Sequence, residues 1–106
     1  MDRIQYEHIA RPGNGETMAM ADGITWLRMP LPFSLNHINL WLLRDDDGWV
    51  IVDTGVDTRT SRDVWGKTFK DAMRGDPATH VIATHLHPDH VGCAGWLVQH
   101  FDADLW

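Results

Sequence analysis

The chain has 106 residues, 43% of them apolar, and a formal net charge of −6. This length and apolar content suit one small globular domain with a packed core and exclude a disordered chain. The acidic balance, without a block of clustered Lys and Arg, argues against nucleic acid or an anionic membrane surface as a partner. No stretch reaches the roughly 18 to 20 apolar residues of a membrane span. Because its single cysteine, Cys93, also fits a reducing compartment, we expect a cytoplasmic protein.

Three apolar runs in the first half of the chain predict β-strands. Residues 23–31 alternate between two faces, which predicts a strand covered on at least one side. Residues 38–44 and 48–53 are two further apolar, partly β-branched runs. They are separated by the turn-rich residues 45–48, so the two runs predict a hairpin.

The second half predicts a helix, a strand and a second helix. Residues 60–74 space their apolar side chains at three- to four-residue intervals, as in an amphipathic helix. Residues 79–85 lack polar alternation at their centre, which predicts a strand buried on both faces. Helical spacing returns over residues 90–100, and residues 104–106 can begin another strand. The order predicts a mixed α/β (α+β) fold with helices covering a sheet, and no domain boundary divides residues 1–106.

Four potential metal ligands fall within six positions between the predicted strand and the second helix: His85, His87, Asp89 and His90. Imidazole and carboxylate groups suit zinc, and also iron or manganese. Extended backbone would place His85 and His87 on the same side. The turn forced by Pro88 can redirect Asp89 and His90, so the two pairs could serve neighbouring metals. The alternative is an exposed polar loop in which Asp89 caps the following helix, and capping does not exclude ligation.

These residues carry a resemblance to a known family. Residues 85–90, HLHPDH, resemble the H-x-H-x-D-H motif of the metallo-β-lactamase superfamily. Residues 50–55, VIVDTG, resemble its strand ending in D-T-G. The two motifs stand in the family's order, about one strand-helix-strand apart. Residues 31–43 are also similar to the opening of the glyoxalase-II-like branch.

The resemblance implies the N-terminal half of an αββα sandwich that hydrolyses an ester, thioester, lactone or amide through a metal-bound hydroxide. It implies a small-molecule substrate and two zinc ions in the full-length protein. His85 and His87 would hold the first metal, and Asp89 and His90 the second. The resemblance also places Asp53 beside the metals, where it would orient a ligand. Asp53 and Asp89 are thus the catalytic candidates, although Asp53 could also be a turn aspartate.

The family's pattern includes further metal ligands after the H-x-H-x-D-H motif, and these are not found after His90 in this sequence. It requires a third histidine, a bridging aspartate and a last histidine, whereas only His100 follows, and it comes too soon. We therefore interpret His100 as a helix-end residue and the chain as the N-terminal half of a longer enzyme. An incomplete metal shell predicts weak metal binding and negligible hydrolysis by this chain alone. Half a sandwich would also expose a sheet face that favours homo-oligomers or pairing with the missing half. The alternative function is a non-catalytic metal-binding or protein-interaction fragment.

Other conspicuous side chains receive simpler interpretations. His37 could line a substrate cleft or be exposed. Cys93 is interpreted as a buried small residue and not as a nucleophile. The tryptophans within the predicted strands and helices are interpreted as core or interface residues: Trp26, Trp41, Trp49, Trp65 and Trp96.

Overall fold

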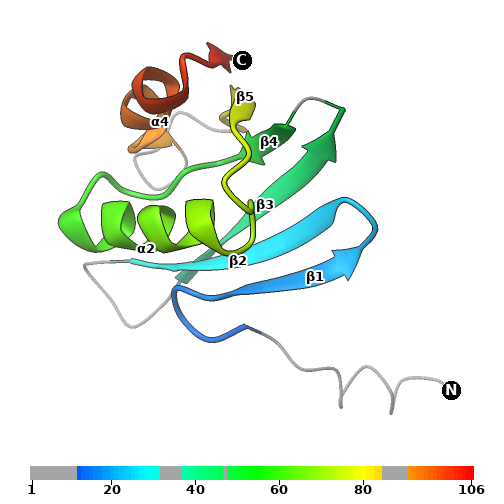
Figure 1. Ribbon diagram of the computed structural model, residues 1–106. Coiled ribbons are helices and arrows are strands. Elements are labelled where there is room, and N and C mark those ends of the chain that lie inside the picture. The colour runs from blue at the N-terminus through cyan, green and yellow to red at the C-terminus, as the bar shows by residue number, and fades with distance from the viewer. Residues whose placement is uncertain (1–11, 32–36, 47, 85–90) are drawn as a thin grey trace, which may run out of the picture.

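The computed structural model describes residues 12–31, 37–46, 48–84 and 91–106 (Figure 1). These residues form one six-stranded sheet and two helices. Strand order in the sheet follows the order in the chain, from β1 to β6. The strands are β1 (Thr17–Ala21), β2 (Ile24–Pro30), β3 (His37–Asp45), β4 (Gly48–Val52), β5 (Ala78–Ile82) and β6 (Asp104–Leu105), and the helices are α2 (Arg59–Lys70) and α4 (Ala94–Phe101).

The first four strands form an antiparallel meander, and the last two are added in parallel. Each parallel step crosses over through a helix, α2 between β4 and β5 and α4 between β5 and β6. Parallel neighbours need such a crossover, because a tight turn can join only antiparallel strands. The predicted mixed fold, the hairpin of β3 and β4, and a strand near residues 104–106 are therefore confirmed.

The pleat sorts apolar side chains onto two unequal faces. Helices α2 and α4 pack on one of them, the inner face (Figure 1). Leu27, Leu40 and Ile51 of this face are fully buried, and they form one core cluster with Trp65 of α2 and Leu97 of α4. The outer face carries partly buried side chains, including Trp26, Trp41, Val50, Val52 and Ile82.

Strand β5 corrects the prediction of a strand buried on both faces. Ala78 and Val81 are buried on the inner face, but His80 and Ile82 are only partly buried. The apolar run of β5 predicted equal burial on both faces of the strand, but it carries no information on which face of the sheet the described helices cover. The helices that the structure describes lie on one side of the sheet only.

Two helix boundaries differ from the predicted ones. Helix α2 ends at Lys70, and the next residues form turns in which Arg74 (φ 56°) and Gly75 (φ 78°) are left-handed. Gly75 donates its backbone N–H to the carbonyl of Phe69 at 2.8 Å, which closes the helix end. Helix α4 begins at Ala94, because a turn at residues 92–93 separates it from a helical Val91; residue 90, the predicted start, lies outside the described residues.

Strand β1 was missed by the sequence patterns. Its five residues, TMAMA, include two alanines, which have low β-propensity. The signal that could have found it is the Asp22-Gly23 pair before β2, because a glycine with positive φ (77°) suits a hairpin turn. No helix in the described part of the chain is long and apolar enough to cross a membrane.

Candidate metal centre

The D-T-G turn (residues 53–55) leads out of β4 and has an unusual backbone. Asp53 (φ 65°) and Gly55 (φ 83°) both occupy the left-handed region. A Cβ on residue 55 would lie 2.9 Å from Cγ of Met29, so the turn comes too close to β2 for a side chain. Asp53 donates its N–H to the carbonyl of Ile82 at 2.7 Å, which ties the turn to the end of β5.

Asp53 is 6% exposed, and its carboxylate holds Thr84, the residue that directly precedes His85. Its Oδ1 accepts the backbone N–H of Thr84 at 2.8 Å. The Thr84 hydroxyl lies 2.8 Å from Oδ2 and donates to the same carboxylate. Hydrogen bonds to a buried carboxylate are among the stronger neutral-to-ion bonds in proteins, so this contact fixes the end of β5 against the end of β4.

Thr54 makes the corresponding contact on the far side of residues 85–92. Its buried hydroxyl accepts the backbone N–H of Cys93 at 3.0 Å, and the Gly55 carbonyl accepts the same N–H at 3.0 Å. The Thr54 carbonyl accepts the indole N–H of Trp65 at 2.9 Å. The turn is thereby joined to α2 as well as to the residue before α4.

The Cys93 side chain is buried and has the properties of a protonated thiol. Burial raises its pKa to about 11, and the negative charge of Asp57 acts in the same direction. Its Sγ lies 3.5 Å from the carbonyl oxygen of Val56, to which the thiol can donate. The interpretation of Cys93 as a buried small residue is confirmed, because a nucleophilic cysteine needs an accessible thiolate.

The four predicted ligands, His85, His87, Asp89 and His90, lie outside the residues that the structure describes. Their arrangement, and the capping alternative for Asp89, stay predictions. Within the described ranges, no group of three or more His, Cys, Asp or Glu could hold a metal. The structure therefore shows the surroundings of the predicted centre: the D-T-G turn and the residues on either side of the ligand segment (residues 85–90).

Two other predicted residues have clear positions. His37 is partly buried and begins β3, opposite Pro30, at the end of the sheet where β4 and β5 finish. His100 lies in the last turn of α4 and stacks on the ring of Phe69 at 4.9 Å between centroids. The interpretation of His100 as a helix-end residue is confirmed.

The tryptophans divide between core and surface as expected for core or interface residues. Trp65 and Trp49 are buried. Trp26 and Trp41 are partly buried and stack on the outer face at 6.1 Å between centroids. Trp96 is partly buried, with the Arg62 guanidinium 5.2 Å from its ring centroid.

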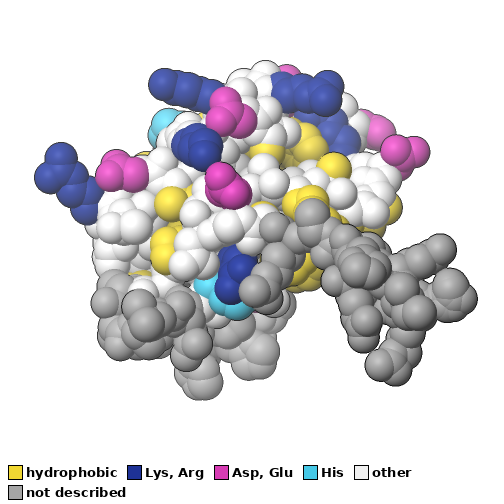
Figure 2. Space-filling view, turned by 90° about the horizontal axis from the view of Figure 1, so that it is seen from below, with side chains coloured by type: hydrophobic (Ala, Val, Ile, Leu, Met, Phe, Trp, Pro, Cys, Tyr) yellow, Lys and Arg dark blue, Asp and Glu magenta, His cyan; other side chains and the backbone are white. Residues whose placement is uncertain are grey.

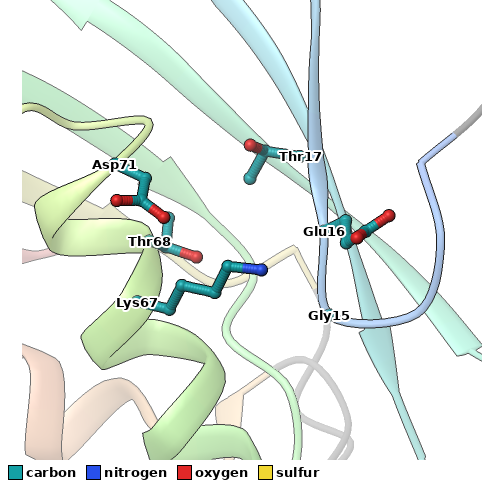
Figure 3. A pocket seen from close by; sticks show the side chains of 6 residues that line it. All are labelled: Gly15, Glu16, Thr17, Lys67, Thr68 and Asp71. Carbon is teal, nitrogen blue, oxygen red and sulfur yellow. The ribbon is translucent and has the colours of Figure 1, made fainter.

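The described surface offers hollows away from this turn. One, of about 360 Å³, lies between α2 and the start of β1, where Lys67 extends toward the strand (Figure 3). Its lining mixes acidic and basic groups. Figure 2 shows the same mixture over one face of the molecule, where Lys and Arg are interspersed with Asp and Glu. The described residues on that face gather no basic patch.

Comparison with known proteins gives a consistent family. The model of the metallo-beta-lactamase superfamily matches residues 34–106, a range that contains both motifs. The chain belongs to the metallo-beta-lactamase superfamily. The predicted recognition is confirmed at this level, and the glyoxalase-II-like branch stays a prediction.

Individual relatives support the same assignment. A beta-lactamase domain protein from Burkholderia ambifaria has a TM-score of 0.85 at 45% identity, over 94% of this chain and 34% of that one. A metallo-beta-lactamase family protein from Thermus thermophilus has a TM-score of 0.67 at 30% identity, over 76% and 27% of the two chains. Bovine acyl-coenzyme A thioesterase MBLAC2 is 32% identical over 80 residues, 70% of this chain. The chain spans 29% of that enzyme's length. The fold is that of part of the superfamily's αββα sandwich.

Sequence patterns did not single out Thr84 or Thr54 as parts of the site. Both belong to the quoted motifs or adjoin them, yet their partners are 31 and 39 positions away in the chain. The signal available was a hydroxyl residue beside each motif's aspartate or histidine. A threonine hydroxyl can donate or accept a hydrogen bond in many environments, so its presence beside a motif does not identify its partner.

Proposed function

We propose that this chain contributes the first ligand segment of a metal-dependent hydrolase that acts on a small-molecule ester, thioester, lactone or amide. The observation that carries the proposal is the Asp53 carboxylate, buried and bonded to both the N–H and the hydroxyl of Thr84. A buried carboxylate that fixes the residue before H-x-H-x-D-H suits a role in orienting metal ligands.

The donor set fits zinc. Three imidazoles and one carboxylate within six positions supply the nitrogen and oxygen ligands that zinc takes in hydrolases, and iron or manganese would accept them too. In this proposal His85 and His87 hold one ion, and Asp89 and His90 hold a second. When bound, such ions polarise a substrate carbonyl and lower the pKa of water.

The protein's own contribution is to place the ligand segment. Asp53 holds its beginning through Thr84, and the backbone bond from Asp53 to Ile82 keeps the ends of β4 and β5 together. Because the site depends on further ligands elsewhere in the family's fold, we propose the activity for a protein that supplies them. This chain alone would bind metal weakly.

Among possible substrates, thioesters come first. The support is the similarity to MBLAC2, an enzyme named as an acyl-coenzyme A thioesterase, at 32% identity over 80 residues. Fold membership by itself does not select a substrate, so the choice depends on this relative.

The experiment uses a protein that contains this chain and supplies the further ligands. It replaces His85, His87 and Asp89 with alanine in one variant and measures bound zinc and hydrolysis of a short-chain acyl-coenzyme A. We expect bound zinc to fall below one ion per chain and turnover to fall about 100-fold or more. The matched control is His100→Ala, which removes a histidine that stacks on Phe69 in α4. Unchanged zinc content and turnover in the triple variant would contradict the proposal.

A non-catalytic role has one observation in its favour, the partly buried outer face with the stacked Trp26 and Trp41. Such a face suits an interaction fragment or a homo-oligomer. Zinc binding without hydrolysis of any carbonyl ester, thioester, lactone or amide would favour this second function.

A further inference from the structure

The D-T-G turn holds the chain at two points that flank the ligand segment. Asp53 bonds to Thr84, and the next residue, Thr54, bonds to the backbone N–H of Cys93. Between these two points lie residues 85–92, which include all four predicted ligands. Two consecutive residues of one turn thus fix both sides of an eight-residue stretch.

The D-T-G turn is itself fixed by contacts with the core, so it can hold the segments bonded to it in place. The indole N–H of Trp65 donates to the Thr54 carbonyl, and Trp65 is fully buried in the core. Gly55 lies against Met29 so closely that a Cβ would have to displace the methionine side chain. Contacts from both α2 and β2 therefore fix the turn in one conformation.

The Thr54 hydroxyl has no solvent alternative. It is fully buried, accepts from Cys93 at 3.0 Å, and can donate to the carbonyl of Gly55 at 3.3 Å. Removing it would leave the Cys93 N–H with the Gly55 carbonyl as its acceptor, at 3.0 Å. One buried hydrogen bond of this kind changes a local opening equilibrium by about tenfold.

We infer that Thr54 is a positioning residue that fixes the C-terminal side of the ligand segment, as Asp53 fixes its N-terminal side. The link to metal binding rests on the proposed function, whereas the attachment of Cys93 does not. Holding both sides lowers the conformational entropy that the segment loses when it binds metal, so the two bonds preorganise the site.

The test compares Thr54→Val, which keeps the shape and removes the hydroxyl, with Thr54→Ser, which keeps the hydroxyl. Amide hydrogen exchange of Cys93 is followed by NMR in the full chain. We expect exchange about tenfold faster in Thr54→Val and close to wild type in Thr54→Ser. The matched control is Thr68→Val, because Thr68 is also a buried threonine, and its hydroxyl donates to Val64 within α2.

Unchanged Cys93 exchange in Thr54→Val would overturn the inference, and so would equal acceleration in Thr54→Ser or Thr68→Val. A second measurement is zinc affinity by competition with a chromophoric chelator, made in a protein that contains this chain and supplies the further ligands. We expect it to weaken about 10- to 100-fold in Thr54→Val only. If neither that protein nor its variants bind zinc while the exchange difference remains, the proposed function fails and the attachment of Cys93 by Thr54 stands.

Discussion

The inner and outer faces of the sheet have similar apolar residues and different surroundings. On β3, Leu40 and Leu42 of the inner face are fully buried under the helices. Trp41, between them in sequence, is partly buried on the outer face and stacks on Trp26. Adjacent residues of one strand therefore differ in burial because the helices that the structure describes pack on one side. Most of the packing energy of the described fold should lie on the inner face.

The largest effect is expected from Leu40→Ala. Because Leu40 is fully buried in the core cluster, truncation removes buried methyl groups and leaves a cavity. We expect the free energy of unfolding to fall by about 2 to 5 kcal/mol, measured by urea denaturation. If Leu40→Ala lowered the free energy of unfolding no more than an outer-face substitution on β3, the conclusion that the inner face carries most of the packing energy would be contradicted.

A smaller loss is expected from Gly55→Ala. The new Cβ would meet Met29 of the inner face at 2.9 Å, and alanine would have to adopt φ 83°. Because Met29 is flexible but fully buried, we expect a loss of about 1 to 3 kcal/mol in thermal unfolding. Gly66→Ala is the matched control, since a Cβ there has nothing within 4 Å. The control should stabilise α2 slightly.

Trp41→Thr tests the outer face. The substitution keeps a residue that suits β3 and removes the stacking on Trp26. We expect a loss of about 1 kcal/mol, well below that of Leu40→Ala. If the outer face mediates homo-oligomers, sedimentation velocity should show a shift toward monomer in this variant. An unchanged distribution of oligomers would place self-association elsewhere.

The smallest change in the free energy of unfolding at neutral pH is expected from Cys93→Ala. This substitution should instead change how that free energy depends on pH above about 9. Burial raises the Cys93 pKa to about 11 in the folded chain, above its ordinary value of 9.0. Between these values the unfolded chain loses the thiol proton first, so stability should fall as pH rises from about 9 to 11. In Cys93→Ala this contribution to the pH dependence should be absent, as followed by thermal unfolding across that range. An identical alkaline decline in both proteins would contradict the assignment.

Sequence patterns predicted the elements whose signal is local. The hairpin of β3 and β4 follows from two apolar runs around an aspartate-rich turn. The amphipathic spacing predicted α2, but its end at Lys70 depends on a hydrogen bond from the Gly75 N–H to the Phe69 carbonyl, which spacing does not encode. The lower burial of the outer face among the described residues was not predictable from these patterns either, because Trp41 is as apolar as its inner-face neighbours.

For the candidate centre, sequence identified the motifs and not their connections. Asp53 was singled out as a residue that orients a ligand, and the structure shows its carboxylate bonded to Thr84. The bond from Cys93 to Thr54 joins residues 39 positions apart. No local pattern specifies that pair, because it exists only when β4, β5 and α4 have come together.

Asp53 also illustrates how a backbone angle restricts substitution. Its φ of 65° is tolerated by glycine and asparagine as well as by aspartate, and by few other residues. Glycine would keep the turn but remove both carboxylate oxygens that accept from Thr84, and asparagine would keep only one oxygen. In a library with all twenty amino acids at this position, selected for function, aspartate should be almost the only survivor. A library selected for folding alone should retain all three.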